Sequence, residues 1–145
     1  MIDIRTSIEI NASAEKVWKI LTDFQAYPEW NPVIQRVEGE LKLGAVLEVY
    51  AKPPGATGSA FKPKVLCVDP YRHFRWLGRW IAPRVLDGEH MFTLEPLSPD
   101  RVRFVNDEEF SGLVTPFYKY LRLDNSRRGF EQMNLALKRQ AEQTR

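Results

Sequence analysis

The chain lacks several features that define common classes of protein. Cys67 is the only cysteine among 145 residues, so no intrachain disulfide can form and the fold needs no oxidising compartment. Two histidines, His73 and His90, and one cysteine cannot supply an ordinary zinc site, and we expect no metal. There is also no glycine-rich phosphate loop and no G-x-S-x-G motif. Redox cofactors and covalent acyl transfer therefore have no support, and we expect no cofactor.

Charge and hydropathy exclude further classes. The net charge is only +2, too small to predict nucleic-acid binding without a concentrated basic patch. No segment is apolar for long enough to span a bilayer, and the opening residues MIDIRTSIEI lack the apolar run of a signal peptide. We therefore expect a cytoplasmic protein without stable membrane insertion. The length and the 43% hydrophobic content predict a single domain, residues 1–145, with a real core.

Alternating apolar residues predict a mostly antiparallel sheet. Ile2, Ile4, Ile8 and Ile10 share one parity, which is typical of a half-buried strand. Further segments of strand character follow at short spacing, separated by turns rich in Pro and Gly. Seven strands are predicted in all, at residues 2–10, 33–40, 46–51, 61–68, 73–80, 88–95 and 101–110.

A short helix is predicted within residues 13–32, SAEKVWKILTDFQAYPEWNP. Ser13 is a good N-cap, and Val17, Trp18, Leu21 and Phe24 recur at helical spacing on one side. The prolines at 28 and 32 prevent a long continuation, so a tight aromatic turn should follow.

The last third of the chain predicts one long helix, at about residues 115–143. Helix formers dominate there, and Pro116 suits the first helical position. Phe117 and Leu121 lie nearly opposite the later apolar stripe of Phe130, Met133, Leu137 and Ala141, with Gly129 between the two sets. Either the helix kinks at Gly129, or its C-terminal half carries most of the packing. We favour the second.

A long helix on the concave side of a strongly twisted sheet explains this order of elements. The concave face should be unusually aromatic, with Trp76, Trp80, Phe92, Phe104 and Phe110 as candidates. Each could fill the core or line a pocket. Together they favour a cavity, because one helix covers a deep curved sheet poorly.

Four segments in order resemble the START-like (SRPBCC) superfamily, and within it the small bacterial polyketide cyclase/dehydrase-like proteins. They are NASAEKVWKILTDFQAYPEWNP, VLDGEHMFTLEP, NDEEFSGLVTP and RRGFEQMNLALK. The resemblance implies an α+β helix-grip fold, in which a curved seven-stranded antiparallel sheet wraps a long C-terminal helix and two short helices follow the first strand. It also implies that small or lipid-like apolar molecules are the usual ligands, but the superfamily is diverse in function and its fold does not choose among activities.

His90 and Glu108 are the polar pair of most interest. Each shares parity with aromatic residues of its strand, so if those aromatics point inward, His90 and Glu108 do too. Facing each other in a dry cavity, they could transfer protons as an acid/base dyad or anchor a ligand. They could equally bond each other or neighbouring residues simply to satisfy buried polar groups, which is the commoner arrangement.

Two further segments have structural and functional interpretations. Trp30 could gate an entrance or clamp the first helix onto the sheet. The apolar residues Phe117 to Leu121 could form a lid or a homodimer contact. The predicted ligand-binding set is therefore Trp30, Trp76, Trp80, His90, Phe92, Phe104, Glu108, Phe110, Phe117 and Leu121.

The leading hypothesis from the sequence is that the protein binds or carries a small hydrophobic molecule, lipid- or polyketide-like, in an internal cavity. The alternative is a cyclase- or dehydratase-type enzyme that uses noncovalent acid/base catalysis by His90 and Glu108 in the same cavity. A third hypothesis is a protein-interaction module acting through residues 117–121.

Overall fold

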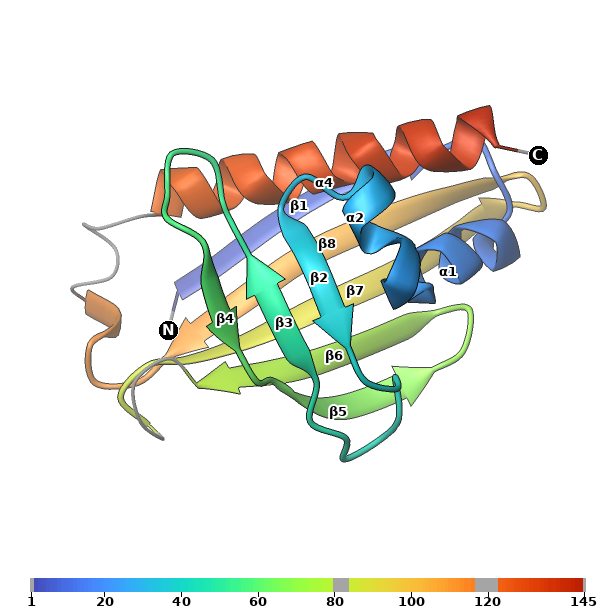
Figure 1. The fold of residues 1–145 in the computed structure, drawn as a ribbon. Helices are drawn as coiled ribbons and strands as arrows, with labels where there is room; N and C mark the ends of the chain where they lie inside the picture. The colour runs from blue at the N-terminus through green and yellow to red at the C-terminus, as the bar shows by residue number, and fades with distance from the viewer. Residues whose placement is uncertain (1, 80–83, 117–122, 145) are drawn as a thin grey trace.

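Two antiparallel sheets form the framework of the computed structural model, which describes residues 2–79, 84–116 and 123–144 (Figure 1). The main sheet has the order β1-β8-β7-β6-β5, and the smaller sheet has the order β2-β3-β4. The strands are β1 (Ile2–Ile10), β2 (Ile34–Glu38), β3 (Glu48–Ala51), β4 (Ser59–Phe61), β5 (Lys64–Asp69), β6 (His73–Arg79), β7 (Asp87–Ser98) and β8 (Arg101–Ser111). An isolated bridge between Val46 and Lys64 connects the two sheets.

Among the described residues there are eight strands, which corrects the predicted count of seven. The single strand predicted at 61–68 is two strands, because β4 pairs with β3 whereas β5 pairs with β6. Pro63 lies at the break and has no backbone N–H to donate to a ladder. Its carbonyl instead accepts a hydrogen bond of 2.9 Å from the Leu47 amide. The chain therefore changes sheets at this proline.

The short helix α1 (Ala14–Thr22) confirms the predicted cap and apolar side. The Ser13 hydroxyl accepts a hydrogen bond of 3.1 Å from the Lys16 amide, and Val17, Trp18 and Leu21 are buried. A 3-10 turn η1 (Phe24–Ala26) and the short helix α2 (Tyr27–Trp30) follow. Burial raises the pKa of Tyr27, whose hydroxyl donates a hydrogen bond to the Leu21 carbonyl. This aromatic turn closes one end of the core.

The long helix α4 (Leu123–Gln143) lies along β1 and is continuous through Gly129 (Figure 1). Met133, Leu137 and Ala141 are buried in the core, as the apolar stripe predicts. Gly129 is also buried, and a Cβ there would lie 3.4 Å from Pro54 and 3.5 Å from Val33. Phe117 and Leu121, which the sequence places on the opposite side, lie outside the described residues. Within the described part of the chain, no helix is long and apolar enough to cross a membrane.

Aromatic rings fill one half of the space between the main sheet and its cover. Phe74 stacks on Phe92 with centroids 4.4 Å apart, and Phe92 in turn lies 6.5 Å from Phe104. All three are fully buried, and they belong to one core cluster that also contains Val37 and Val49 of the smaller sheet. The core is therefore solid on the side of α1. Any hollow must lie toward the opposite ends of β6, β7 and β8.

A candidate ligand-binding cavity

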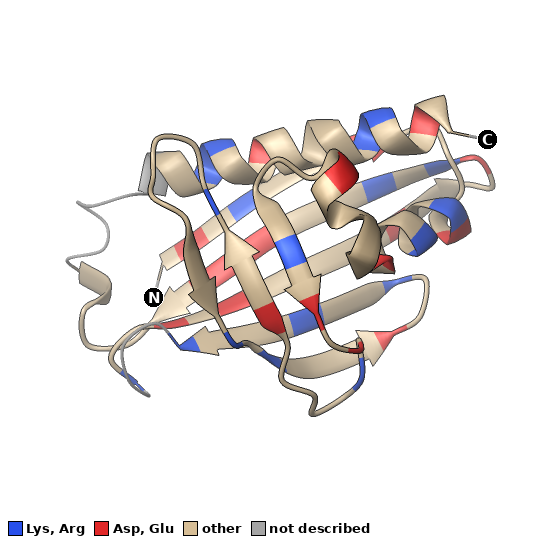
Figure 2. Ribbon diagram, in the orientation of Figure 1, with Lys and Arg blue, Asp and Glu red and all other residues tan. Residues whose placement is uncertain are grey.

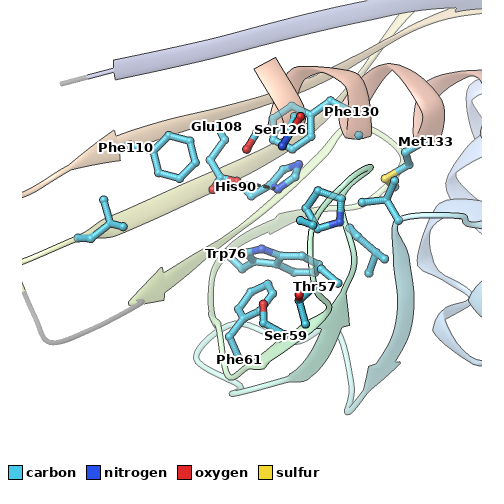
Figure 3. Close-up of a pocket in the computed structure, with 18 residues that line it drawn as sticks. Thr57, Ser59, Phe61, Trp76, His90, Glu108, Phe110, Ser126, Phe130 and Met133 are labelled. Atoms are coloured by element: carbon cyan, nitrogen blue, oxygen red, sulfur yellow. Dashed lines mark ion pairs between the residues drawn. The ribbon is translucent and has the colours of Figure 1, made fainter. Parts of the chain in front are cut away.

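A cavity of about 310 Å³ lies between the main sheet, the N-terminal half of α4 and the loop that joins β3 to β4 (Figure 3). Its apolar wall includes Phe61, Trp76, Phe110, Phe130 and Met133. Thr57 and Ser59 also line it and are solvent-exposed, so the cavity opens to solvent beside β4.

Paired glycines shape the main sheet beneath this space. Gly78 of β6 lies opposite Gly88 of β7, and both are buried. The ring of Phe61 sits only 3.5 Å from where a Cβ of Gly78 would be. The ring of Phe61 therefore packs directly over the backbone of the main sheet at Gly78.

His90 and Glu108 meet on the inner face of the main sheet. They are directly opposite each other in the β7–β8 ladder, so their side chains point to the same face. Their exposed fractions are 6% and 7%. The Nδ1 atom of His90 lies 3.1 Å from Oε2 of Glu108, and both side chains line the cavity (Figure 3). The parity of the two strands predicted this encounter, whereas the role of the pair stays a prediction.

The His90 ring is held in place by aromatic neighbours on several sides. It stacks on Phe92 with centroids 4.2 Å apart and planes within 5° of parallel. Phe130 packs against it at 4.9 Å, and Trp76 presents an edge at 5.9 Å. The imidazole therefore has little freedom to turn, and its two nitrogens keep fixed directions.

A buried polar network continues from the far side of His90. The Nε2 atom lies 2.6 Å from Oδ1 of Asn106, whose amide nitrogen donates to Oδ1 of Asn134 at 3.0 Å. The Asn134 amide donates to the Thr6 hydroxyl at 2.9 Å, and Thr6 donates to the Asn106 carbonyl at 2.7 Å. All of these residues are buried. The network thus links the cavity wall to α4 and β1.

Sequence reasoning identified both members of the dyad but missed three members of this network, Thr6, Asn106 and Asn134. Asn106 shares parity with Phe104 and Glu108, which could have placed it on the inner face. Thr6 shares parity with the isoleucines of β1 in the same way. Asn134 gave a weaker signal, because it follows Met133 at the edge of an apolar stripe and its burial depends on how α4 meets β1.

The other predicted ligand-binding residues either line the cavity, lie elsewhere in the structure, or fall outside the described residues. Trp76 and Phe110 line the cavity. Phe92 and Phe104 lie in the filled half of the core instead, because neighbouring rings on the sheet cover them.

Trp30 also lies outside the lining. It is half-buried and packs edge-on against Tyr27 at 5.1 Å, which favours the structural interpretation of this tryptophan.

Trp80, Phe117 and Leu121 lie outside the described residues. The lid or homodimer contact at 117–121 therefore stays a prediction.

Among the described residues that line the cavity, only His90 and Glu108 are ionisable. Figure 2 shows basic and acidic residues interspersed along the strands and helices. On the main sheet they pair with one another, as Arg75 does with Glu89 and Arg103 with Glu95, both at 3.2 Å. In residues 2–79, 84–116 and 123–144, no three His, Cys, Asp or Glu side chains gather closely enough to hold a metal ion.

This architecture, an antiparallel sheet around one long C-terminal helix with a cavity between them, defines the START-like helix-grip class. A START superfamily protein from Mycobacterium smegmatis matches with a TM-score of 0.72 at 23% identity, over 97% of both chains. Norcoclaurine synthase from Thalictrum flavum, in complex with dopamine and hydroxybenzaldehyde, matches with a TM-score of 0.76 at 16% identity, over 99% of this chain and 88% of that one. The Zhui aromatase/cyclase from Streptomyces sp. R1128 matches with a TM-score of 0.70 at 20% identity, over 98% and 94%. At these identities the likeness shows the fold alone.

The sequence itself identifies the family. The family model described as polyketide cyclase / dehydrase and lipid transport matches residues 1–142, and the chain belongs to this family. That description covers both catalysis and carriage, so membership does not choose between the two. No curated protein matches the chain by sequence.

Proposed function

We propose that the protein binds a small hydrophobic molecule, lipid- or polyketide-like, in the cavity beneath α4 and carries or sequesters it. The observation that carries this proposal is an open cavity of about 310 Å³ whose wall is mainly aromatic and aliphatic. Pockets for small molecules span about 300–1,000 Å³ and have this kind of lining, with a few polar groups that orient the ligand. The volume is at the lower end of that range, which favours a compact guest.

A cavity-filling substitution tests this proposal. Ala51 lines the cavity, and replacement by Phe would occupy part of the hollow. The matched control is Ala60→Phe, which places the same side chain on the neighbouring strand β4 at a position outside the lining. We expect compounds from lipid and aromatic polyketide panels to raise the melting temperature of the wild type and of Ala60→Phe, but not that of Ala51→Phe.

Native mass spectrometry of the purified protein provides a second measurement, in which a retained apolar guest would appear as added mass. If no apolar compound stabilised the wild type, or if Ala51→Phe bound as the wild type does, the proposal would be contradicted.

A second candidate function, noncovalent acid/base catalysis, is favoured by the geometry of the dyad. The 3.1 Å contact between His90 and Glu108 is within hydrogen-bond reach, and both residues line the cavity. Glu108 as a carboxylate could remove a proton from a carbon beside a ligand carbonyl and return it to the resulting enolate. Two proteins of the same fold, norcoclaurine synthase and the Zhui aromatase/cyclase, are enzymes by name.

Deuterium uptake tests catalysis without knowledge of the substrate. The two-ring ketone 2-tetralone exchanges its activated C–H protons with D₂O, and NMR follows the rate. An active dyad predicts faster exchange with the wild type than with His90→Gln or Glu108→Gln. The control Glu109→Gln makes the same change one residue further along β8 and should exchange as the wild type does. Equal rates for all four proteins would exclude proton transfer by the dyad.

A further inference from the structure

The directions of the hydrogen bonds place a proton on Nε2 of His90. The Thr6 hydroxyl donates its hydrogen bond to the backbone carbonyl of Asn106, so its oxygen is the acceptor for the side-chain amide of Asn134. Asn134 then presents its own carbonyl oxygen to the Asn106 amide, which leaves Oδ1 of Asn106 facing His90. An amide oxygen at 2.6 Å can only accept, so Nε2 must carry a hydrogen.

The contact between Nδ1 of His90 and Glu108 then holds one further proton. Without it, a nitrogen lone pair would face a carboxylate oxygen at 3.1 Å, and two acceptors do not attract each other. The proton lies either on the imidazole, giving an imidazolium and a carboxylate, or on Glu108, giving two neutral groups. In both arrangements the pair as a whole has no net charge.

Glu108 keeps a free acceptor in both arrangements. Its Oε2 atom is engaged by His90, and no described residue forms a hydrogen bond or ion pair with Oε1. Both nitrogens of His90 are already engaged by Glu108 and Asn106, so the imidazole has no donor left for a ligand. The dyad therefore offers a ligand an acceptor and no donor.

Among the described residues that line the cavity, none is Lys, Arg or Asp. An anionic head group would enter a largely apolar space beside a pair with no net charge, and no described lining residue is a cation that could offset its desolvation.

We propose that the cavity selects neutral amphipathic ligands whose hydroxyl or phenol group donates a hydrogen bond to Glu108, and that it rejects carboxylates. This inference rests on the proposed function, because it names the chemistry of the molecule that the cavity binds. The apolar body of such a ligand packs against Trp76 and Phe130, on either side of the dyad (Figure 3).

Three two-ring probes that differ in one group test the inference by isothermal titration calorimetry. These are 2-naphthol, which donates a hydrogen bond, 2-methoxynaphthalene, which only accepts, and 2-naphthoate, which is anionic. We expect 2-naphthol to bind the wild type about tenfold more tightly than the methyl ether. This ratio of dissociation constants corresponds to the free energy of one hydrogen bond to the carboxyl oxygen of Glu108. 2-Naphthoate should bind more weakly than either.

Substitutions of Glu108 provide the matched comparison. Glu108→Gln keeps the shape but makes the acceptor an uncharged amide, so the preference for 2-naphthol over the ether should shrink to about threefold or less. Glu108→Met removes the acceptor, and the preference should disappear. Glu109→Gln changes the adjacent residue, whose side chain points to the opposite face of the sheet, and should keep the wild-type preference. Circular dichroism checks that each variant folds. If Glu108→Met does not fold, the preference of Glu108→Gln alone is compared with that of the wild type.

The outcomes separate this inference from the proposed function. Equal binding of 2-naphthol and its ether, or tighter binding of 2-naphthoate, would overturn the inference while leaving ligand binding in place. An unchanged preference in Glu108→Gln and Glu108→Met would overturn it too. If none of the three probes bound the wild type, the proposed function would itself fail, because these compact molecules suit a cavity of this size.

Discussion

At the scale of single residues, the site depends on backbone positions as well as on side chains. Gly112 follows β8, with φ at +118°, a region that residues with a side chain rarely adopt. The amides of Leu113 and Val114 donate to the carbonyls of Arg84 and Val85, both at 3.0 Å. This turn fixes the segment before β7, whose Leu86 lines the cavity.

Replacement of Gly112 by Ala should destabilise the protein strongly. The new Cβ would lie 2.5 Å from the Val85 carbonyl oxygen, which is backbone and cannot move aside, and φ would be strained as well. We expect a loss of about 3 kcal/mol in the free energy of unfolding, measured by urea denaturation.

Gly44→Ala is the matched control, because φ is +83° there but nothing lies within 4 Å of the added Cβ. Its free energy of unfolding should fall by about 1–2 kcal/mol, because only the strain of the positive φ acts there. Similar losses in the two variants would mean that the close approach to Val85 has no energetic weight.

At the scale of elements, α4 is attached to β1 by specific polar contacts as well as by apolar packing. Lys138 donates to the Glu9 carbonyl at 2.8 Å, and Arg127 donates to the Arg5 carbonyl at 3.2 Å. Between them the Asn134 amide reaches Thr6. The helix therefore has a defined position along the strand, and this position aligns Asn134 with the dyad.

Asn134→Ala should weaken this attachment. The substitution leaves the Asn106 amide with only a distant sulfur contact to Met133, at 3.8 Å, and removes the donor to Thr6. Buried groups left without partners cost about 1–3 kcal/mol, so the urea midpoint should fall accordingly. Gln132→Ala, on the exposed side of the same helix, should change stability by less than about 0.5 kcal/mol. Equal midpoints for both variants would mean that the network contributes nothing to stability.

The sequence predicted most elements because each has a strong local signal. The Ser13 cap, the parity of β1 and the alternation of β6 and β8 depend on neighbouring residues alone. The division of the predicted strand 61–68 had no such signal, because Pro63 marks a break but does not say which partner each half takes. The partner of a strand depends on distant residues, here Val49 and Trp76, which lie opposite Phe61 and Val65.

At the scale of the whole molecule, the two sheets and α4 leave one half of the interior full and the other half hollow. Parity predicted correctly that Trp76, Phe92 and Phe104 face inward, but it could not divide them between core and cavity. That division depends on where the smaller sheet and α4 cover the main sheet, which is a property of the tertiary arrangement. The dyad could be predicted because its two members lie opposite each other on adjacent strands. Asn106 shares the parity of Glu108 on the same strand, whereas the position of Asn134 depends on how α4 meets β1 and could not be predicted.

The Thr6–Asn106–Asn134 links have a consequence for how the site is made in the cell. Thr6 is 100 residues before Asn106 and 128 before Asn134, so the cluster draws on widely separated parts of the chain. During synthesis on the ribosome, a nascent polypeptide that ends before α4 has neither Asn134 nor Phe130. It can pair β7 with β8 and bring His90 to Glu108, yet it has no wall on the helix side to retain a guest. For the proposed function, loading of a guest therefore requires that translation has passed Phe130 and Asn134 of α4.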